Sequence, residues 1–417
     1  MGDRPGTGSL APRVAIAGCG PAGAVLGFLL ARAGVPTVVF EKHGDFLRDF
    51  RGDTIHPSTL EILDEIGLAD RFLQLPHTKV SSITVRSTSG QTLTLSLARV
   101  PTKFPYIAFV PQWDFLEFLT HEAARFPTFQ LKRESEVVDL VHAGNAVTGV
   151  RYVDAAGSHD MTVTLTVGAD GRGSKTREAA ALPLAESSPP MDVLWFRVPR
   201  HPDEARAVAA RLGIGRLLVM LDRNEYWQIA FVIPKGAAER VRAAGLDAFR
   251  QEVAATAPDL ADRVSYVRSW DDVRLLTVRA DRLTRWYKPG YLAIGDAAHA
   301  MSPIGGVGIN VAIHDAVAAA NVLWKPLAAG AVSEADLALV QRLRERPVRI
   351  IQAFQSAVQT SFIKQVLEST KPATVPLAAR ALARIPILRD LPPRLIALGI
   401  NRPHVETPEA VHPLHVD

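Results

Sequence analysis

The sequence predicts an α/β protein in which a discontinuous Rossmann-like domain is combined with a second domain based on a β-sheet and with helices at the C-terminus. Three observations predict this class. Residues 13–41 read as a strand, a glycine turn, a helix and a second strand. Two later apolar strands, at 161–167 and 291–294, also lead into a glycine and a carboxylate. Residues 183–269 instead alternate aromatic, strand-like runs with Ala-rich segments that we interpret as helical.

The first βαβ unit carries a dinucleotide-binding motif. Its glycines, Gly18, Gly20 and Gly23, have G-x-G-x-x-G spacing between an apolar strand and a helix that begins with Pro21 and Ala22. The first glycine permits a sharp turn, the second permits close approach of a pyrophosphate, and the third permits helix and strand to pack closely. Glu41 ends the second strand about twenty residues later, where an acid accepts hydrogen bonds from a ribose. An acid there favours an unphosphorylated ribose, as in FAD or NAD, without choosing between them.

Length and composition narrow the classes of function. At 417 residues, the chain is long enough for two or three domains. The net charge of +4 comes from scattered basic residues without a nucleic-acid-binding motif, so we expect no nucleic-acid partner. Cys19 is the only cysteine, which excludes an intrachain disulfide. The first twelve residues lack a signal-like apolar core, and no uninterrupted apolar run appears long enough to span a bilayer. We therefore expect a cytoplasmic protein without a metal ion.

The remaining elements follow from local patterns. Residues 57–66 have the apolar spacing of a helix, and residues 80–97 alternate around Ser89-Gly90 as in a β-hairpin. A helix is expected from Gln112 to about residue 126, followed by strands over 129–167 that are broken near 144 and 156. Further helices are expected from Gly308 past Trp324 and over 333–367. We see no internal repeat.

Three distant segments share one shape, an apolar strand that ends in glycine and a carboxylate. They are the first βαβ unit, the segment Gly168-Ala169-Asp170-Gly171 and the pair Gly295-Asp296. Ligands of open parallel sheets bind beyond the carboxyl ends of the strands, so all three segments can converge on one extended cofactor. Asp-Gly and Gly-Asp are also ordinary turn pairs, so neither pair alone indicates a binding site. The inference of a shared cofactor site rests on the occurrence of all three segments in this order.

Together with Gly295-Asp296-Ala297-Ala298-His299, Pro303 and the run 305–310 (GGVGIN), these motifs resemble the FAD-dependent single-component monooxygenases, the p-hydroxybenzoate hydroxylase-like family. The resemblance covers roughly residues 13–345. It implies an FAD-binding domain made of residues 1–80, 100–182 and 270–335, a substrate-binding β-sheet domain made of 81–99 and 183–269, and a C-terminal helical segment over 336–417.

The resemblance also assigns roles to matching positions. It implies that Glu41 and the neighbouring Lys42 lie at the adenosine, and that Asp170 is tied to both FAD and NADPH binding. Asp296 would bind the ribityl chain, and Pro303 and Arg51 would lie at the flavin face. The implied cofactor-binding set is Gly18, Gly20, Pro21, Ala22, Gly23, Glu41, Lys42, Arg51, Gln112, Asp170, Gly295, Asp296, Gly306, Gly308, Ile309 and Asn310.

The implied reaction needs noncovalent FAD, with NAD(P)H as a transient reductant. It uses O2 to hydroxylate an aromatic or conjugated small molecule through a flavin C4a-hydroperoxide. The lack of a second glycine fingerprint agrees with a transient reductant. Ser302 and Val307 stand where the family commonly has Pro and Gln, which leaves the substrate open. Candidate substrate contacts are Trp195, Arg197, Met220, Trp227, Gln228 and Pro303, although strand aromatics and a methionine are more often core residues. His56 and His299 are equally compatible with structural roles.

Other hypotheses remain open at this point. An FAD-dependent dehydrogenase or reductase, or a halogenase, would use the same fold, although Trp227-Gln228-Ile229-Ala230-Phe231 lacks the second Trp of the W-x-W-x-I-P halogenase signature. A non-enzymatic protein could use residues 375–400, which mix Arg with aliphatic residues, to associate with a membrane surface. Prolines interrupt that stretch, so we expect a terminal helix packed on the protein instead.

Overall fold

The computed structural model describes residues 11–47, 54–204, 208–371, 374, 385 and 389–411. A six-stranded sheet forms its nucleotide-binding part, with the strand order β20-β21-β12-β1-β2-β8. Five of these strands are parallel and the short edge strand β20 is antiparallel. The bounds are β1 Val14–Ala17, β2 Thr37–Phe40, β8 Phe129–Lys132, β12 Leu165–Gly168, β20 Tyr287–Lys288 and β21 Tyr291–Ala293.

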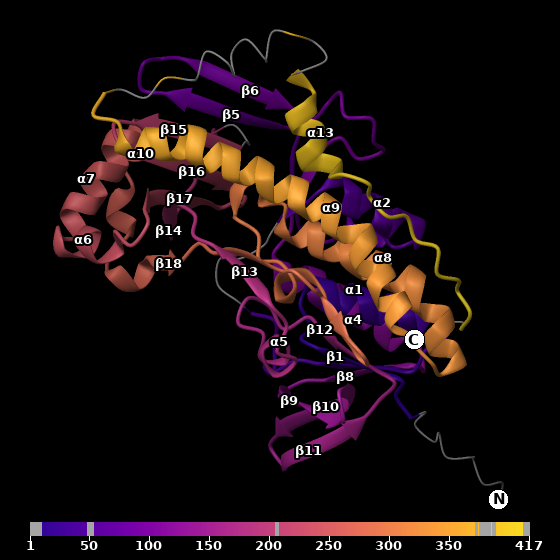
Figure 1. Cartoon of the computed structure of the whole chain (residues 1–417). Coiled ribbons are helices and arrows are strands. Elements are labelled where there is room, and N and C mark those ends of the chain that lie inside the picture. The colour runs from indigo at the N-terminus through magenta and orange to yellow at the C-terminus, as the bar shows by residue number, and fades with distance from the viewer. Residues whose placement is uncertain are drawn as a thin grey trace, which may run out of the picture.

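The inner strands of this sheet are buried along their whole length, because both faces are covered. Every residue of β1, β2, β12 and β21 is buried, which explains their continuous apolar runs. Helix α1 (Pro21–Arg32) contacts both α4 (Gln112–Ala124) and α8 (Gly308–Ala329). An antiparallel sheet of β9 (Glu136–Ala143), β10 (Ala146–Asp154) and β11 (Gly157–Thr162) contacts β12 through β10 (Figure 1). The predicted βαβ unit and the two predicted strand breaks are confirmed.

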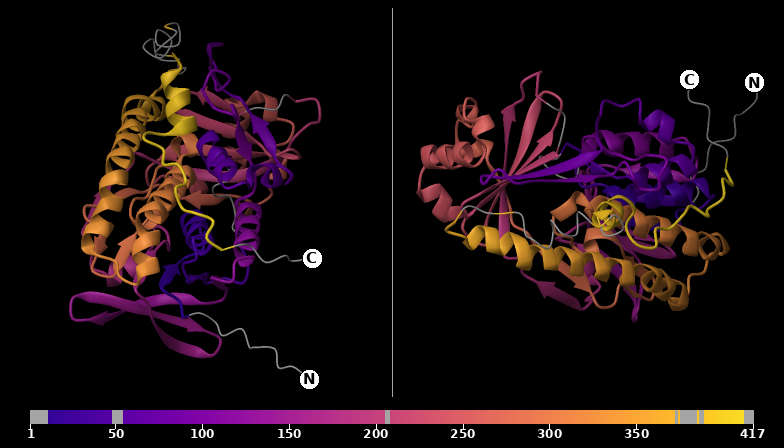
Figure 2. Two further views of the ribbon diagram at one scale, coloured as in Figure 1. Left: turned by 90° about the vertical axis from the view of Figure 1, so that its right-hand side faces the viewer. Right: turned by 90° about the horizontal axis from the view of Figure 1, so that it is seen from above.

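A seven-stranded sheet forms the second part of the molecule, in the order β18-β14-β17-β16-β15-β5-β6. Its helical cover consists of α6 (Ala238–Ala243) and α7 (Leu246–Thr256), which lie beyond one face of the sheet (Figure 2). The predicted hairpin joins this sheet, with β5 parallel to β15. The bounds are β5 Ser82–Ser87, β6 Thr92–Ser96, β14 Met191–Pro199, β15 Val208–Gly213, β16 Arg216–Asp222, β17 Tyr226–Pro234 and β18 Arg274–Leu276.

Strand β15 corrects a prediction, because its Ala-rich sequence indicated a helix. The strand pairs with β16 on one side and β5 on the other. The ladder with β16 is a local hairpin, and the ladder with β5 joins strands about 120 residues apart in the chain. Together they outweigh a helix propensity that amounts to less than about 1 kcal/mol per residue. The expected helices of this region are instead α6 and α7.

Smaller elements connect the two parts. A three-stranded sheet contains β3 (Thr54–Ile55), β7 (Ile107–Phe109) and β4 (Thr78–Val80), and a two-stranded sheet pairs β13 (Leu184–Ser187) with β19 (Ala280–Leu283). The short helices are α2 Pro57–Glu65, α3 Ala69–Phe72 and α5 Lys175–Ala179. Single 3₁₀ turns comprise η1 Pro258–Leu260, η2 Val264–Tyr266, η3 Trp270–Asp272, η4 Gly295–Ala297 and η5 Ile304–Gly306.

A long helical rod runs along the molecule (Figure 1). It consists of α9 (Glu334–Val358), a π-helical turn η6 (Gln359–Ile363) and α10 (Lys364–Glu368). Ser333 and Asp336 form a capping box at its N-terminus, and α10 contacts β16 and β17 at its other end. The rod therefore spans from the nucleotide-binding part to the seven-stranded sheet.

Two features bear on the membrane hypotheses. The helical segment 304–329, which comprises η5 and α8, is long and apolar enough to cross a bilayer, a feature that the sequence analysis did not identify. However, 72% of its most apolar stretch is buried within the protein. Most of residues 375–388 lie outside the described residues. The helix that follows, α13 (Leu391–Leu398), buries Ala397 and Leu398 against Phe109 and other apolar residues. Both helices are therefore accounted for by packing inside the protein.

Candidate active site

The glycine turn after β1 has the steric properties that a phosphate cradle needs. Gly18 has φ +95°, and a Cβ there would lie 2.6 Å from the carbonyl oxygen of Ala169. A Cβ on Gly23 would lie well inside van der Waals contact with the carbonyl oxygen of Gly18. At Gly20, in contrast, a Cβ would meet no atom of the described residues within 4 Å. Two of the three glycines therefore serve packing, and the third presents open backbone.

The open glycine caps helix α1, which starts with Pro21. The first turn of α1 contains no acidic residue, so nothing opposes the partial positive charge of the helix N-terminus. The amides of Ala22 and Gly23 are among the first-turn donors that have no partner within a helix. This donor set and the space beside Gly20 fit the pyrophosphate of a dinucleotide.

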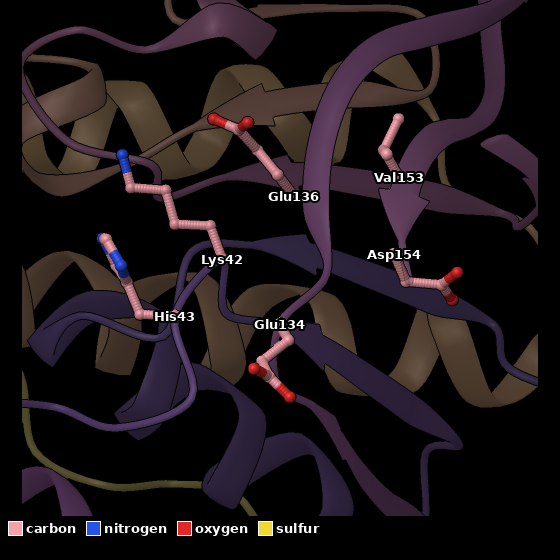
Figure 3. A pocket seen from close by; sticks show the side chains of 6 residues that line it. All are labelled: Lys42, His43, Glu134, Glu136, Val153 and Asp154. Atoms are coloured by element: carbon pink, nitrogen blue, oxygen red, sulfur yellow. The ribbon is translucent and has the colours of Figure 1, made fainter. Parts of the chain in front are cut away.

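Glu41 lies just beyond the carboxyl end of β2, as expected for a ribose acceptor. Its side chain is 9% exposed, and its Oε1 accepts a hydrogen bond of 3.1 Å from the backbone N–H of His43. Lys42 is exposed and lines a surface recess with His43, Glu134, Glu136, Val153 and Asp154 (Figure 3). The carboxylate-rich lining places Lys42 in a favourable field, and Glu136 already pairs with Lys175 at 2.8 Å.

Asp170 accepts three hydrogen bonds within the loop after β12. Its Oδ1 accepts hydrogen bonds from the hydroxyls of Ser174 (2.5 Å) and Thr176 (2.9 Å), and its Oδ2 accepts one from the Thr176 amide (3.0 Å). Gly171 follows with φ +83°. These hydrogen bonds of Asp170 shape the loop at the start of α5, so a role toward FAD or NADPH would be exerted through that loop.

Two arginines that the sequence analysis missed join this loop to the Gly295-Asp296 segment. Arg172 donates from Nε to Asp296 Oδ2 at 3.1 Å. Arg177, 7% exposed, donates to the carbonyl oxygens of Arg172 (2.9 Å) and Ala297 (3.3 Å). Arg172 follows Asp170-Gly171 directly, which is the signal that could have identified it.

The Gly295-Asp296 segment also packs on the first βαβ unit and on α8. A Cβ at Gly295 would lie 3.1 Å from Ala22 Cβ and 3.2 Å from Ala312 Cβ. Together with the contact between Gly18 and Ala169, this geometry confirms that the three glycine–carboxylate segments converge at the carboxyl ends of β1, β12 and β21.

A buried ionic cluster lies behind Gly295. Asp315, fully buried, accepts hydrogen bonds from Gly295 N (3.1 Å), His299 Nε2 (2.5 Å) and Arg344 Nε (2.9 Å). Burial alone would raise the pKa of Asp315, but His299 and Arg344 outweigh it and lower the pKa below its usual value. His299 therefore has a structural partner, which favours the structural interpretation of this residue.

The start of α8 is shaped by glycines with positive φ. Gly305 has φ +76° and Gly306 φ +64°, and the carbonyl oxygen of Gly306 accepts a hydrogen bond of 3.0 Å from Thr54 Oγ1. Gly308 and Ile309, the first two residues of α8, are partly exposed. Asn310 is buried, and its Oδ1 accepts from His56 N (3.0 Å) and Thr59 Oγ1 (2.7 Å). Its side chain thus joins α2 to α8.

Two further predicted residues lie beside this region. Gln112 is the first residue of α4 and follows β7, which pairs with β3 at Thr54. Pro303 is partly exposed and directly precedes the 3₁₀ turn η5. Arg51 lies outside the described residues.

The predicted substrate contacts divide between the two faces of the seven-stranded sheet. Trp195, Arg197 and Gln228 share one face, because Trp195 pairs with Ala230 and Arg197 with Gln228. Met220 and Trp227 lie on the other face and pack in a buried cluster with Phe249 of α7. Trp227 also donates from Nε1 to Glu204 Oε2 at 2.6 Å. This placement corrects our expectation for Met220 and Trp227, which belong to the core under the helical cover.

The face of the seven-stranded sheet that carries Trp195 lies near the segment around Pro303. Trp195 and Ile304 both pack against a cluster that contains Ala230 and Val232 of β17. The sheet face with Trp195 therefore lies next to the residue that follows Pro303.

A family model described as "FAD binding domain" matches residues 12–352. The chain belongs to this FAD-binding family. A 6-methylpretetramide 4-monooxygenase of Streptomyces rimosus is 29% identical over 384 residues, which cover 91% of each chain. The alignments with the next two curated relatives cover about 75% of this chain but only 61% and 62% of the relatives' own lengths.

Solved structures show the same fold. PqsL of Pseudomonas aeruginosa, a probable FAD-dependent monooxygenase, has a TM-score of 0.74 at 22% identity, covering 86% of this chain and 98% of PqsL. The flavin-dependent halogenase CmlS also has a TM-score of 0.74, at 20% identity, covering 94% of this chain and 73% of CmlS. The fold is thus shared by flavoproteins that catalyse different reactions.

In this FAD-binding chain, the histidine beside α2 is also structural. His56 is fully buried, and its Nδ1 donates to the carbonyl oxygen of Ile396 at 2.7 Å. Burial lowers the pKa of His56 to about 4, and the bond to Ile396 only partly opposes this shift. His56 is therefore neutral at pH 7 and holds α2 against the C-terminal helix α13.

Proposed function

We propose that this chain is an FAD-dependent monooxygenase that uses NAD(P)H and O2 to hydroxylate an aromatic or conjugated small molecule. The observation that carries the proposal is the convergence of the three glycine–carboxylate segments beside a sheet face that presents Trp195. The relative named as a monooxygenase, aligned over 91% of both chains, supports the same reaction class.

Successive segments of the chain would bind successive parts of FAD, from the pyrophosphate and adenosine to the flavin ring. The first turn of α1 binds the pyrophosphate, Glu41 accepts from the adenosine ribose, and Lys42 lies nearby. Asp296 accepts from the ribityl hydroxyls and is oriented by Arg172. The backbone of Gly306, Gly308, Ile309 and Asn310 lies beside the flavin ring.

Bound FAD would supply the activation of O2 and the transfer of one oxygen atom. The chain contributes position and electrostatics. Because the N-terminus of α8 carries partial positive charge, it stabilises the negative charge of a reduced ring. Trp195, Arg197 and Gln228 orient the substrate, and Pro303 lies at the ring. The sheet and the cofactor-binding part exclude water between them, which limits loss of the activated oxygen.

The proposal keeps the discontinuous organisation expected from the sequence. Residues 1–80, 100–182 and 270–335 would bind FAD, 81–99 and 183–269 would bind substrate, and 336–417 would form the helical segment. NAD(P)H would bind transiently, because the chain has a single glycine fingerprint. A cytoplasmic location is part of this proposal, since the reaction consumes NAD(P)H.

Labelled oxygen tests the reaction type. With purified holoenzyme, NAD(P)H, ¹⁸O2 and a panel of phenolic and polycyclic aromatic substrates, we expect a product that carries one ¹⁸O atom and NAD(P)H oxidation that rises several-fold with the right substrate. An oxidised product without label would contradict the proposal and favour a dehydrogenase. A halogenated product formed only with added halide would favour a halogenase.

A further inference from the structure

Three glutamines of the helical rod form hydrogen bonds with residues around Pro303, just before Gly305 and Gly306. Gln352, Gln355 and Gln359 are spaced by three and four residues, which places them on one face of the rod. Gln352 donates to the carbonyl oxygens of Asp281 (3.0 Å) and Ala300 (3.3 Å). The rod thus makes side-chain contacts with a loop more than fifty residues earlier in the chain.

The two glutamines nearest Pro303 are the most buried. Gln355 donates from Nε2 to the carbonyl oxygens of Ser302 and Ile304, each at 2.9 Å. Gln359 donates from Nε2 to Ser302 Oγ at 2.7 Å. Their side chains belong to residues that are 2% and 4% exposed. Both residues flanking Pro303 are therefore fixed by amide donors of the rod.

Gln359 reaches Ser302 at the point where the rod changes its helical geometry. It is the first residue of the π-helical turn η6, a type of turn that is often found at functional sites. Ile363, which ends the turn, and Val366 of α10 are buried in the same cluster as Ala230 and Val232 of the seven-stranded sheet. One continuous element thus contacts both the Pro303 segment and the proposed substrate sheet.

The resemblance described in the sequence analysis implies a proline at position 302, where this chain has Ser302. A proline at this position fixes its own backbone dihedral, whereas a serine does not. In this chain the hydroxyl of Ser302 takes the hydrogen bond from Gln359, so the bond supplies a constraint that a proline ring would supply covalently.

We propose that Gln355 and Gln359 are positioning residues, which set the location of Pro303 relative to the flavin ring and the substrate. This inference rests on the proposed monooxygenase function. When the bonds are lost, the segment 302–304 loses its fixed position, so oxygen transfer to the substrate competes less well with release of hydrogen peroxide. Binding of FAD through the first βαβ unit and Asp296 remains.

The test measures coupling, defined as the fraction of oxidised NAD(P)H that appears as hydroxylated product rather than hydrogen peroxide. Gln355→Met and Gln359→Met keep the side-chain volume but remove the donors. For Gln359→Met we expect roughly a 2- to 10-fold fall in the ratio of product to peroxide, the range that corresponds to loss of one neutral hydrogen bond. Gln355→Met loses two hydrogen bonds and should lower the ratio at least as much. FAD content and the rate of NAD(P)H oxidation without substrate should change less than twofold.

Two further variants separate positioning from general destabilisation. Ser302→Ala removes the Gln359 contact from the other side and should reduce the ratio as much as Gln359→Met. In the double variant Ser302→Ala/Gln359→Met, the ratio should be no lower than in either single variant, because both substitutions remove the same hydrogen bond. Ser356→Ala alters an exposed residue of the same helical turn and serves as the matched control.

Wild-type coupling in Gln355→Met, Gln359→Met and Ser302→Ala, measured with a wild type that does hydroxylate, would overturn the inference and leave the proposed function standing. Additive losses in the double variant would also overturn it. A wild type that gives no hydroxylated product with any substrate would instead refute the proposed function, and this inference with it.

Discussion

Gly20→Ala should separate cofactor binding from protein stability. Gly20 has φ −75° and ψ −175°, a conformation that alanine adopts readily, and the added Cβ meets no described atom within 4 Å. Alanine lowers the entropy of the unfolded chain by about 0.4–1 kcal/mol but is a poorer N-cap than glycine by a similar amount. The two effects offset, so the apoprotein should unfold within about 0.5 kcal/mol of wild type.

FAD binding should respond very differently. The methyl group occupies the space beside the backbone that we assign to the pyrophosphate. Losing one hydrogen bond to a charged group costs about 1.5–3 kcal/mol, which corresponds to FAD binding that is roughly 10- to 150-fold weaker. Thermal unfolding of the apoprotein and fluorescence titration with FAD measure the two quantities separately.

Gly23→Ala is the contrasting variant. Its Cβ would overlap the carbonyl oxygen of Gly18, so the apoprotein itself should lose about 1–3 kcal/mol of stability. Wild-type FAD affinity in Gly20→Ala would refute the assignment of the open backbone to the pyrophosphate. Equal stability of Gly23→Ala and wild type would refute the packing argument.

Three other predictions concern single side chains. Asp296→Ala should weaken FAD binding about 10- to 100-fold, because a ribityl hydroxyl loses a charged acceptor; a fully occupied variant after gel filtration would contradict the assignment. Glu41→Arg should also lower FAD affinity, and an unchanged titration curve would show that the ribose lies elsewhere. Because the pKa of His56 is about 4 when folded and about 6.5 when unfolded, the unfolded chain binds more protons between these values. Stability should therefore fall by about 3 kcal/mol from this group as the pH drops from about 6.5 to 4, and His56→Gln should flatten that part of a denaturation profile.

The sequence was most informative where structure depends on neighbouring residues. The βαβ unit, the hairpin and the long helices were predicted correctly, since their apolar period and turn residues are local signals. Strand β15 was not, because it pairs with β5, which lies about 120 residues earlier in the chain. Met220 and Trp227 were predicted as substrate contacts, but the register of β16 and β17 places both on the face covered by α7.

The same limit applies to the candidate site. Glycines with special conformations were found from spacing alone, as Gly18 and Gly306 illustrate. The contacts of Arg172 with Asp296 and of Gln359 with Ser302 join residues 124 and 57 positions apart. The position of Arg172 after Asp170-Gly171 could have singled out the residue, but nothing local identifies its partner Asp296 or pairs Gln359 with Ser302, so these contacts required the folded structure.

The discontinuous sheets have a consequence for how the chain is made. Strand β15 follows the hairpin β5–β6 by about 120 residues. At a synthesis rate of about 5–20 residues per second, the hairpin would therefore remain unpaired with β15 for roughly 6–25 s. Strand β12 likewise stays at an open edge until β21 emerges. Exposed strand edges attract other chains, so aggregation during synthesis is the main hazard of this topology. Shortened forms that end before Tyr291 would keep that edge of β12 open, which favours aggregation of such fragments.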